Sequence, residues 1–146
     1  MSETVSIEQM LREKGVYVGT TVGTSMEPLL RTRRDVVVIE KPAGRLKKYD
    51  VPLYRRGEDY VLHRIVKVLP DSYVILGDNC RNREYGITDD DIIGVLTAFY
   101  RKGKYCTVTD WRCRAYVCFI RVLRPLRLAY WALRSLAARI YHRLVT

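Results

Sequence analysis

Residues 16–28 read VYVGTTVGTSMEP, and this stretch decides the fold class expected for the chain. From Val16 to Val22 the sequence follows the two-residue period of a β-strand. Gly23 and Pro28 then interrupt the pattern, which predicts a tight turn between them. Ser25 is therefore expected where a strand ends and a turn begins.

Short elements continue on both sides of this stretch. Upstream, residues 6–14 are predicted to form a helix, with Ser6 and Gln9 as a capping box and Gly15 as its stop. Downstream, the predicted strands cover residues 36–40, 51–55, 60–69, 73–76 and 92–100, with 104–109 as a further candidate. Many short strands with little helix predict a mainly β fold, a closed or coiled antiparallel β-body.

Charge divides the chain unevenly. The 146 residues carry a net charge of +10, yet residues 111–146 hold eight arginines and no Asp, Glu or Lys, which leaves +2 for the other 110 residues. We therefore expect an N-terminal helix in residues 1–15, a β domain in 16–110 and a basic tail in 111–146. A basic tail favours an acidic partner such as lipid headgroups, nucleic acid or an acidic protein surface.

Cysteine spacing and hydropathy give expectations about cofactors and location. No Cys-x-x-Cys pair occurs, and neither His63 nor His142 lies at a zinc-type spacing from a cysteine, so we expect no metal and no cofactor. The first 15 residues lack the apolar core of a signal peptide, and no apolar run approaches the length of a membrane span. These features predict a cytoplasmic protein, or one peripheral on the cytosolic membrane face, with reduced thiols.

Three short blocks, Gly23–Pro28, Val61–Val66 and Leu76–Asn79, carry candidate chemistry. A serine becomes a nucleophile when a base takes its proton and a backbone N–H receives the oxyanion. Gly23 permits the tight turn that would present the Ser25 amide to a substrate carbonyl. A serine beside glycine and proline is also an ordinary turn former, so Ser25 alone would be weak support for an enzyme.

Together the blocks resemble the signal peptidase I superfamily of serine peptidases, which includes the self-cleaving LexA-type repressors. The resemblance covers residues 16 to about 100. It implies the signal peptidase/LexA-like β fold and a serine endopeptidase that cleaves a peptide or precursor protein through a Ser-His dyad or triad. Since we expect no membrane anchor, we expect a small precursor, leader peptide or membrane-proximal substrate rather than ordinary secretory signal cleavage.

His63 is the candidate base. Bacterial leader peptidases and LexA-type proteins have lysine at the matching position, whereas the endoplasmic-reticulum form has His-Arg, as His63-Arg64 does here. A lysine base must be strongly desolvated, while an imidazole already titrates near neutral pH. On a strand over 60–69, alternation would place His63 on the same face as Val61, Ile65 and Lys67. Lys67 is the alternative base on that face.

Two acids could orient the imidazole. Asp78 belongs to the Gly77-Asp78-Asn79 block that the family shares, whereas in the reticulum-type pattern the acid lies six residues later, at Glu84. We favour Glu84 slightly, although Asp78 could equally shape its loop and Glu84 could be a solvated surface charge.

Residues beside Ser25 are candidates for oxyanion and substrate binding. Gly23 stands where several family members have a hydroxyl residue, and Thr24 stands where glycine is frequent, so the resemblance assigns oxyanion stabilisation mainly to the Ser25 N–H. Met26 is expected under the nucleophile or in the substrate pocket. These departures, with Glu84, leave open a catalytically inactive peptide-binding or membrane-recruited module of the same fold.

The tail is expected to be helical from Leu126. Leu126, Leu133 and Leu144 follow the helical repeat together with Tyr130, Ala137 and Ile140, while Arg127, Arg134, Arg139 and Arg143 lie off that face. Pro125 is expected to separate this helix from an apolar segment at 115–123. Binding to an anionic membrane surface is favoured over packing on the β-body or a partner, and nucleic acid is the least favoured.

Overall fold

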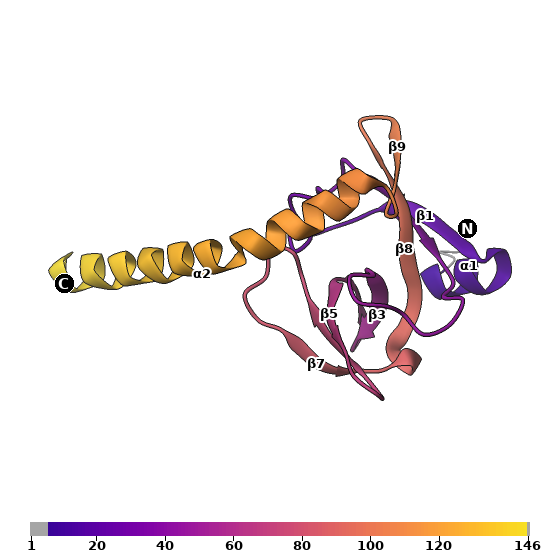
Figure 1. The fold of residues 1–146 in the computed structure, drawn as a ribbon, viewed down its shortest axis with the longest axis horizontal. Coiled ribbons are helices and arrows are strands. Elements are labelled where there is room, and N and C mark those ends of the chain that lie inside the picture. The colour runs from indigo at the N-terminus through magenta and orange to yellow at the C-terminus, as the bar shows by residue number, and fades with distance from the viewer. Residues whose placement is uncertain (1–5, 146) are drawn as a thin grey trace, which may run out of the picture. The chain divides into compact units, whose positions relative to one another are not determined.

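The computed structural model describes residues 6–145 and divides into two compact units, one ending at Asp110 and the other beginning at Trp111 (Figure 1). The first unit is mainly β, with two antiparallel sheets. Its elements are α1 (Ile7–Lys14), β1 (Val16–Thr20), β2 (Val36–Glu40), β3 (Pro52–Arg56), β4 (Asp59–Leu62), β5 (Arg64–Val68), β6 (Tyr73–Leu76), β7 (Glu84–Ile87), the 3-10 helix η1 (Asp89–Asp91), β8 (Ile92–Arg101) and β9 (Lys104–Thr107). The second unit is one helix, α2 (Trp111–Val145).

The predicted N-terminal helix is confirmed over α1. Ser6 caps it by accepting a hydrogen bond from the Gln9 N–H at 3.1 Å, and Gly15 ends it in the left-handed conformation. Only half of the predicted capping box forms, because the Gln9 side chain donates to Glu13 instead of reaching back to Ser6. The first five residues of the predicted segment lie outside the described residues.

The larger sheet has the strand order β1-β2-β8-β3-β4, with β9 paired to β8. All of its pairs are antiparallel, and bulges interrupt the β2/β8 and β3/β8 registers. A bulge adds a residue to one strand and increases the local twist. The long β8 therefore curves through the sheet (Figure 1), and β1 and β4 lie at the two ends of the strand order, whereas β9 is paired to β8 alone.

The smaller sheet has the order β5-β6-β7. The prediction of one strand over residues 60–69 is wrong: β4 ends at Leu62, β5 begins at Arg64, and the two strands belong to different sheets. His63 is the single residue at this crossover. The expected alternation of His63 with Val61, Ile65 and Lys67 on one strand face is therefore wrong as well.

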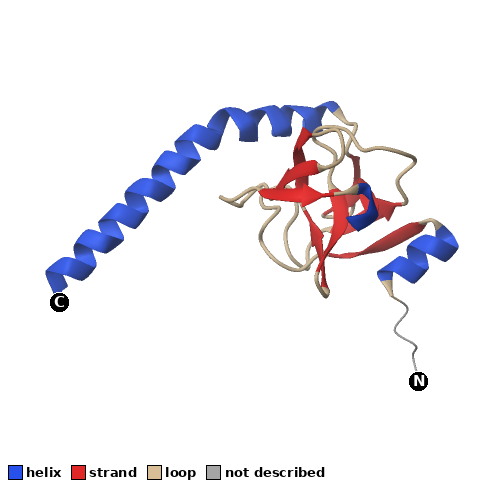
Figure 2. Cartoon of the chain, turned by 90° about the horizontal axis from the view of Figure 1, so that it is seen from below, coloured by secondary structure: helices blue, strands red, loops and turns tan. Residues whose placement is uncertain are grey.

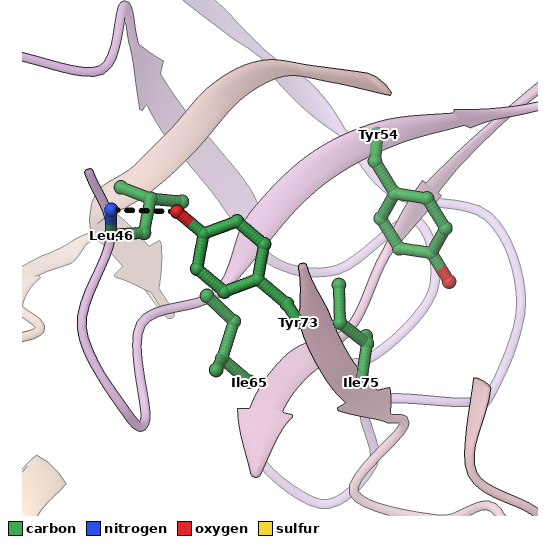
Figure 3. Close-up of a cluster of buried hydrophobic side chains, with 5 residues drawn as sticks. All are labelled: Leu46, Tyr54, Ile65, Tyr73 and Ile75. Carbon is green, nitrogen blue, oxygen red and sulfur yellow. Dashed lines mark hydrogen bonds between the residues drawn. The ribbon is translucent and has the colours of Figure 1, made fainter. Parts of the chain in front are cut away.

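A buried apolar cluster joins the two sheets (Figure 3). Tyr54 comes from β3, whereas Ile65, Tyr73 and Ile75 come from the smaller sheet, and Leu46 from the loop before β3. The Tyr73 hydroxyl accepts a hydrogen bond from the Leu46 N–H at 3.1 Å, so the buried phenol is not left unpaired. Packing across this cluster fixes the position of one sheet relative to the other, and the site residues lie on or next to these sheets.

The predicted helix break at Pro125 in the second unit is wrong. α2 runs through this proline as a continuous helix (Figure 2). An internal proline removes one backbone hydrogen bond and crowds the carbonyl four residues earlier, which costs about 3 kcal/mol. The flanking sequence is rich in Leu, Ala and Arg, which are strong helix formers, and helical turns continue on both sides. No helix among residues 6–145 is long and apolar enough to cross a membrane.

Candidate active site

Ser25 lies in the turn that follows β1. Gly23 has a φ of +101°, in the left-handed region that favours glycine, although a Cβ there would meet nothing within 4 Å. The backbone conformation, rather than crowding, therefore requires this glycine. The Glu27 N–H closes the turn by donating to the Thr24 carbonyl at 3.1 Å, and the Thr32 hydroxyl donates to the Gly23 carbonyl. Ser25 is half-buried in this turn.

The segment Gly77–Asn79 holds the serine turn from the other sheet. The Asn79 backbone N–H donates to the Ser25 carbonyl at 2.8 Å, and its side-chain amide donates to the Thr24 carbonyl at 3.2 Å. Two hydrogen bonds from one residue fix both the position and the orientation of the turn. The family resemblance drew attention to this block without assigning this contact to Asn79.

Gly77 marks the point where the three sequence blocks meet. A Cβ on Gly77 would lie 2.9 Å from the Ser25 carbonyl oxygen and 3.0 Å from His63 Nε2. The Ser25 carbonyl oxygen and His63 Nε2 therefore both border one position, where a single added carbon atom would crowd the two of them. Only glycine allows the strand end to pass this close to both groups.

His63 is buried, and its two ring nitrogens face different surroundings. Nδ1 lies 3.1 Å from Glu84 Oε1 and 3.2 Å from the Tyr54 hydroxyl, whereas Nε2 lies beside Gly77. An ionised carboxylate only accepts hydrogen bonds, so Nδ1 carries the proton of the neutral ring and Nε2 keeps its lone pair. The free lone pair therefore lies on the side of the ring near the Ser25 backbone.

Burial lowers the pKa of His63 from its ordinary value, and this outweighs the opposing effect of the Glu84 carboxylate. Arg56 also lowers the pKa of His63, since a second cation nearby disfavours the imidazolium. The imidazole is therefore neutral at pH 7 and able to accept a proton. This is the protonation state that a general base needs.

Glu84 is shared between the histidine and an arginine. It lies at the start of β7, where its carboxylate accepts hydrogen bonds from the Arg56 guanidinium and contacts His63 Nδ1. Arg56 in turn donates to the Tyr54 hydroxyl at 3.4 Å. Burial raises the pKa of Tyr54, so this hydroxyl stays protonated beside the ring. Of the two candidate acids, Glu84 is the one that the structure brings to His63.

Asp78 has a different partner. Both of its carboxylate oxygens accept from the Arg64 guanidinium, with distances of 2.8 Å to Nε and Nη2, and both side chains are buried. Arg64 also donates to the Tyr49 carbonyl at 3.1 Å. Arg64 directly follows His63, and Asp78 directly precedes Asn79, which holds the turn around Ser25. This ion pair therefore joins the start of β5 to the segment Gly77–Asn79. Asp78 therefore lies near the site without contacting the imidazole through a hydrogen bond.

Ser25 and His63 face a common cleft of about 1020 Å³. Within the described residues, no hydrogen bond joins the Ser25 hydroxyl to the imidazole. The cleft is also lined by Gly23, Met26 and Glu84, but Thr24 contributes only backbone hydrogen bonds to the turn. Met26 is 5% exposed and forms part of an apolar floor with Leu30, Val37, Ile39 and Leu53.

No protein-family model matches the chain, and no curated protein matches it. The chemistry of the cleft is therefore inferred from its own side chains.

The sequence alone did not indicate three residues of the site. Tyr54 and Arg56 lie on β3, and only the pairing of β3 with β4 and the packing of the two sheets bring them to His63 and Glu84. Cys80 lines the cleft, and its sulfur would lie 2.6 Å from a Cβ on Gly77. Its position directly after Gly77-Asp78-Asn79 was the one available signal. Burial raises the pKa of the Cys80 thiol, which leaves it protonated and weakly nucleophilic.

Proposed function

We propose that the chain is a serine endopeptidase that resembles signal peptidase I, with Ser25 as nucleophile, His63 as general base and Glu84 as the residue that positions the base. The observation that carries this proposal is the packing at Gly77, which brings the Ser25 backbone close to His63 Nε2 while Glu84 engages Nδ1. A serine, a neutral imidazole and an acid in this order are the components of serine-peptidase chemistry.

In the proposed reaction, His63 Nε2 takes the Ser25 hydroxyl proton as Oγ attacks the substrate carbonyl. The tetrahedral intermediate collapses when the imidazolium gives its proton to the leaving amine, which breaks the peptide bond and leaves an acyl-enzyme. His63 then takes a proton from water as the water oxygen attacks the acyl carbon. The ester bond to Ser25 Oγ breaks, the imidazolium returns the proton to Oγ, and the acid product leaves. Glu84 stabilises the imidazolium that forms in each half of the cycle.

The Ser25 backbone N–H is the proposed oxyanion donor. Within the described residues it donates no hydrogen bond to another protein group, and Ser25 lines the cleft. A fixed donor directed at a developing oxyanion is worth roughly 10²-fold to 10³-fold in rate. The hydrogen bonds from Asn79 and Glu27 hold the turn that orients this donor.

An extended peptide is the substrate that the cleft suits best. The cleft volume is at the upper end of the range for small-molecule pockets, about 300–1,000 Å³. Residues from two edge strands of the larger sheet line it, Thr20 to Gly23 at the end of β1 and just beyond it, and Asp59 to Leu62 in β4. Edge strands have backbone groups that pair with an added strand, and the apolar floor accepts its side chains.

The proposal is tested by labelling and turnover. We expect a serine-reactive fluorophosphonate to label the purified protein at Ser25, and a mixture of unstructured peptides to be cleaved. Ser25→Ala should abolish both, and His63→Ala should abolish cleavage. Ser72→Ala is the matched control, since Ser72 lies in a turn outside the cleft, and it should retain both activities. Cleavage that survives Ser25→Ala would exclude the assigned nucleophile.

A non-catalytic peptide-binding module is the second candidate. Two observations favour it: the described residues show no Ser25–His63 hydrogen bond, and Glu84 is shared with Arg56. Such a module would bind peptides in the cleft with equal affinity in the wild type and in Ser25→Ala, and it would give no labelled Ser25. Calorimetric peptide binding together with labelling separates the two candidates.

A further inference from the structure

α2 carries one apolar stripe along its whole length. Trp111 and Val122 continue the stripe that the sequence placed only after Pro125. Its large members are separated by four, seven or eleven residues, close to one, two and three helical turns: Trp111, Val122, Leu126, Leu133, Ile140 and Leu144. The proline therefore leaves the two halves of the stripe in register.

The stripe is exposed. These six side chains show between 51 and 81% of their surface, and no residue of α2 from Trp111 to Val145 is buried. A continuous apolar surface of this kind on a helix indicates a partner that covers it. At about 1.5 Å per residue, the 35-residue helix offers a stripe roughly 50 Å long.

The charged side chains of α2 all have the same sign. Its eight arginines lie off the stripe, and the sequence from Trp111 onward contains no acidic residue. Pairing two copies of the helix would bring like charges together without a compensating carboxylate, which disfavours a self-associated coil. The guanidinium group instead matches phosphate, to which it can donate two parallel hydrogen bonds.

From this charge and pattern we infer that α2 lies along the surface of an anionic phospholipid membrane, with the stripe in the acyl boundary and the arginines at the headgroups. Trp111 and Tyr130 have the amphipathic rings that favour this boundary. Nucleic acid would satisfy the arginines but leave the stripe in water. A lipid surface accommodates both faces of the helix at once.

Co-sedimentation of the full chain with vesicles tests this inference. We expect binding to vesicles of equal phosphatidylglycerol and phosphatidylcholine, at least about tenfold weaker binding to phosphatidylcholine alone, and a loss of affinity as salt rises. Equal binding to vesicles with and without phosphatidylglycerol would overturn the proposed contact between the arginines and anionic headgroups. An absence of binding to both would overturn the inference as a whole.

Two aspartate substitutions separate the stripe from the charge. Leu133→Asp places a carboxylate in the stripe and should weaken vesicle binding by about tenfold to a hundredfold. Ala138→Asp adds the same charge on the opposite side of the helix and should cost about fivefold. Equal losses would show that only charge matters, and would overturn the buried stripe. Circular dichroism should show equal helix content in the two variants.

A fluorescent DNA duplex in the same assay gives the competing outcome. Tight DNA binding by the full chain without vesicle binding would overturn the membrane assignment. Because neither substitution touches the cleft, peptide cleavage should be unchanged in both variants. Membrane binding and peptidase activity can therefore fail independently of each other.

Discussion

The β-body and α2 treat charge in opposite ways. In the body, buried charges are paired: Arg64 with Asp78, and Asp35 with Arg34 and Arg101. α2 has eight arginines, no acid and no buried residue. The difference is that opposite charges are brought together inside the folded body, whereas the helix carries charges of one sign with no acidic residue among them.

The sharpest way to break this comparison is to remove one arginine from each region. Arg64→Met leaves the buried Asp78 carboxylate without its partner and should lower the free energy of unfolding by about 3–5 kcal/mol. Arg139→Met on the exposed helix should change it by less than about 0.5 kcal/mol. Urea unfolding followed by fluorescence measures both. Restoration of stability in Arg64→Met/Asp78→Leu would support the unpaired carboxylate as the cause, and equal small effects in the single variants would contradict the contrast.

Gly77 tests whether the body positions its cleft by close packing. In Gly77→Ala, the added methyl would press on the Ser25 carbonyl and His63 Nε2, so we expect kcat/KM for peptide cleavage to fall by about 10²-fold. Gly103→Ala is the control for a methyl group without crowding, because a Cβ there meets nothing within 4 Å; its positive φ adds a backbone strain that Gly77→Ala does not have. Full activity in Gly77→Ala would show that catalysis does not depend on the close approach of Ser25 and His63 at Gly77.

Glu84 tests the electrostatics of the base. Glu84→Gln removes a carboxylate that raises the pKa of His63, so the pKa falls further and the acidic limb of the kcat/KM profile moves to lower pH. Activity in both proteins is present above the His63 pKa and is lost as pH falls through it. At the plateau we expect about a tenfold decrease, because the imidazolium loses its charged partner. Glu58→Gln at the rim of the same cleft should change neither quantity, and an unmoved limb in Glu84→Gln would contradict the role of Glu84.

Asn79 should give the smallest effect. Asn79→Ala deletes the hydrogen bond to the Thr24 carbonyl but keeps the backbone bond to Ser25, which corresponds to a cost of about 1 kcal/mol, or roughly fivefold in kcat/KM. Asn82→Ala in the same cleft is the matched control. Identical kinetics for the two variants would show that the side chain of Asn79 does not hold the turn.

Local pattern was sufficient for much of the fold. The predicted strands 36–40 and 73–76 have the observed bounds of β2 and β6, and the helix after Ser6 forms. β7 was missed because Glu84-Tyr85-Gly86-Ile87 is only four residues long and contains a glycine, which is typical of a turn, and its strand geometry comes from pairing with β6. The division at His63 was missed because Val61 to Val66 is continuously β-like, and only the existence of two sheets interrupts it.

The candidate site divides in the same way. Ser25 and His63 could be nominated from short blocks because glycine and proline determine local backbone geometry. The choice between Asp78 and Glu84 could not be made locally, because it depends on Arg64 occupying one carboxylate and on β7 bringing the other to Nδ1.

By itself the sequence determined the β character of the body, the composition of the serine turn and the cationic, apolar-striped nature of the tail, since these depend on neighbours along the chain. Only the tertiary structure decided that His63 lies at the crossover between two sheets, that Asp78 pairs with Arg64 and that Gly77 brings the Ser25 backbone to the imidazole. The physical reason is that side-chain partners and burial, which set both geometry and pKa, arise from residues far apart in the chain that come together only when the two sheets pack.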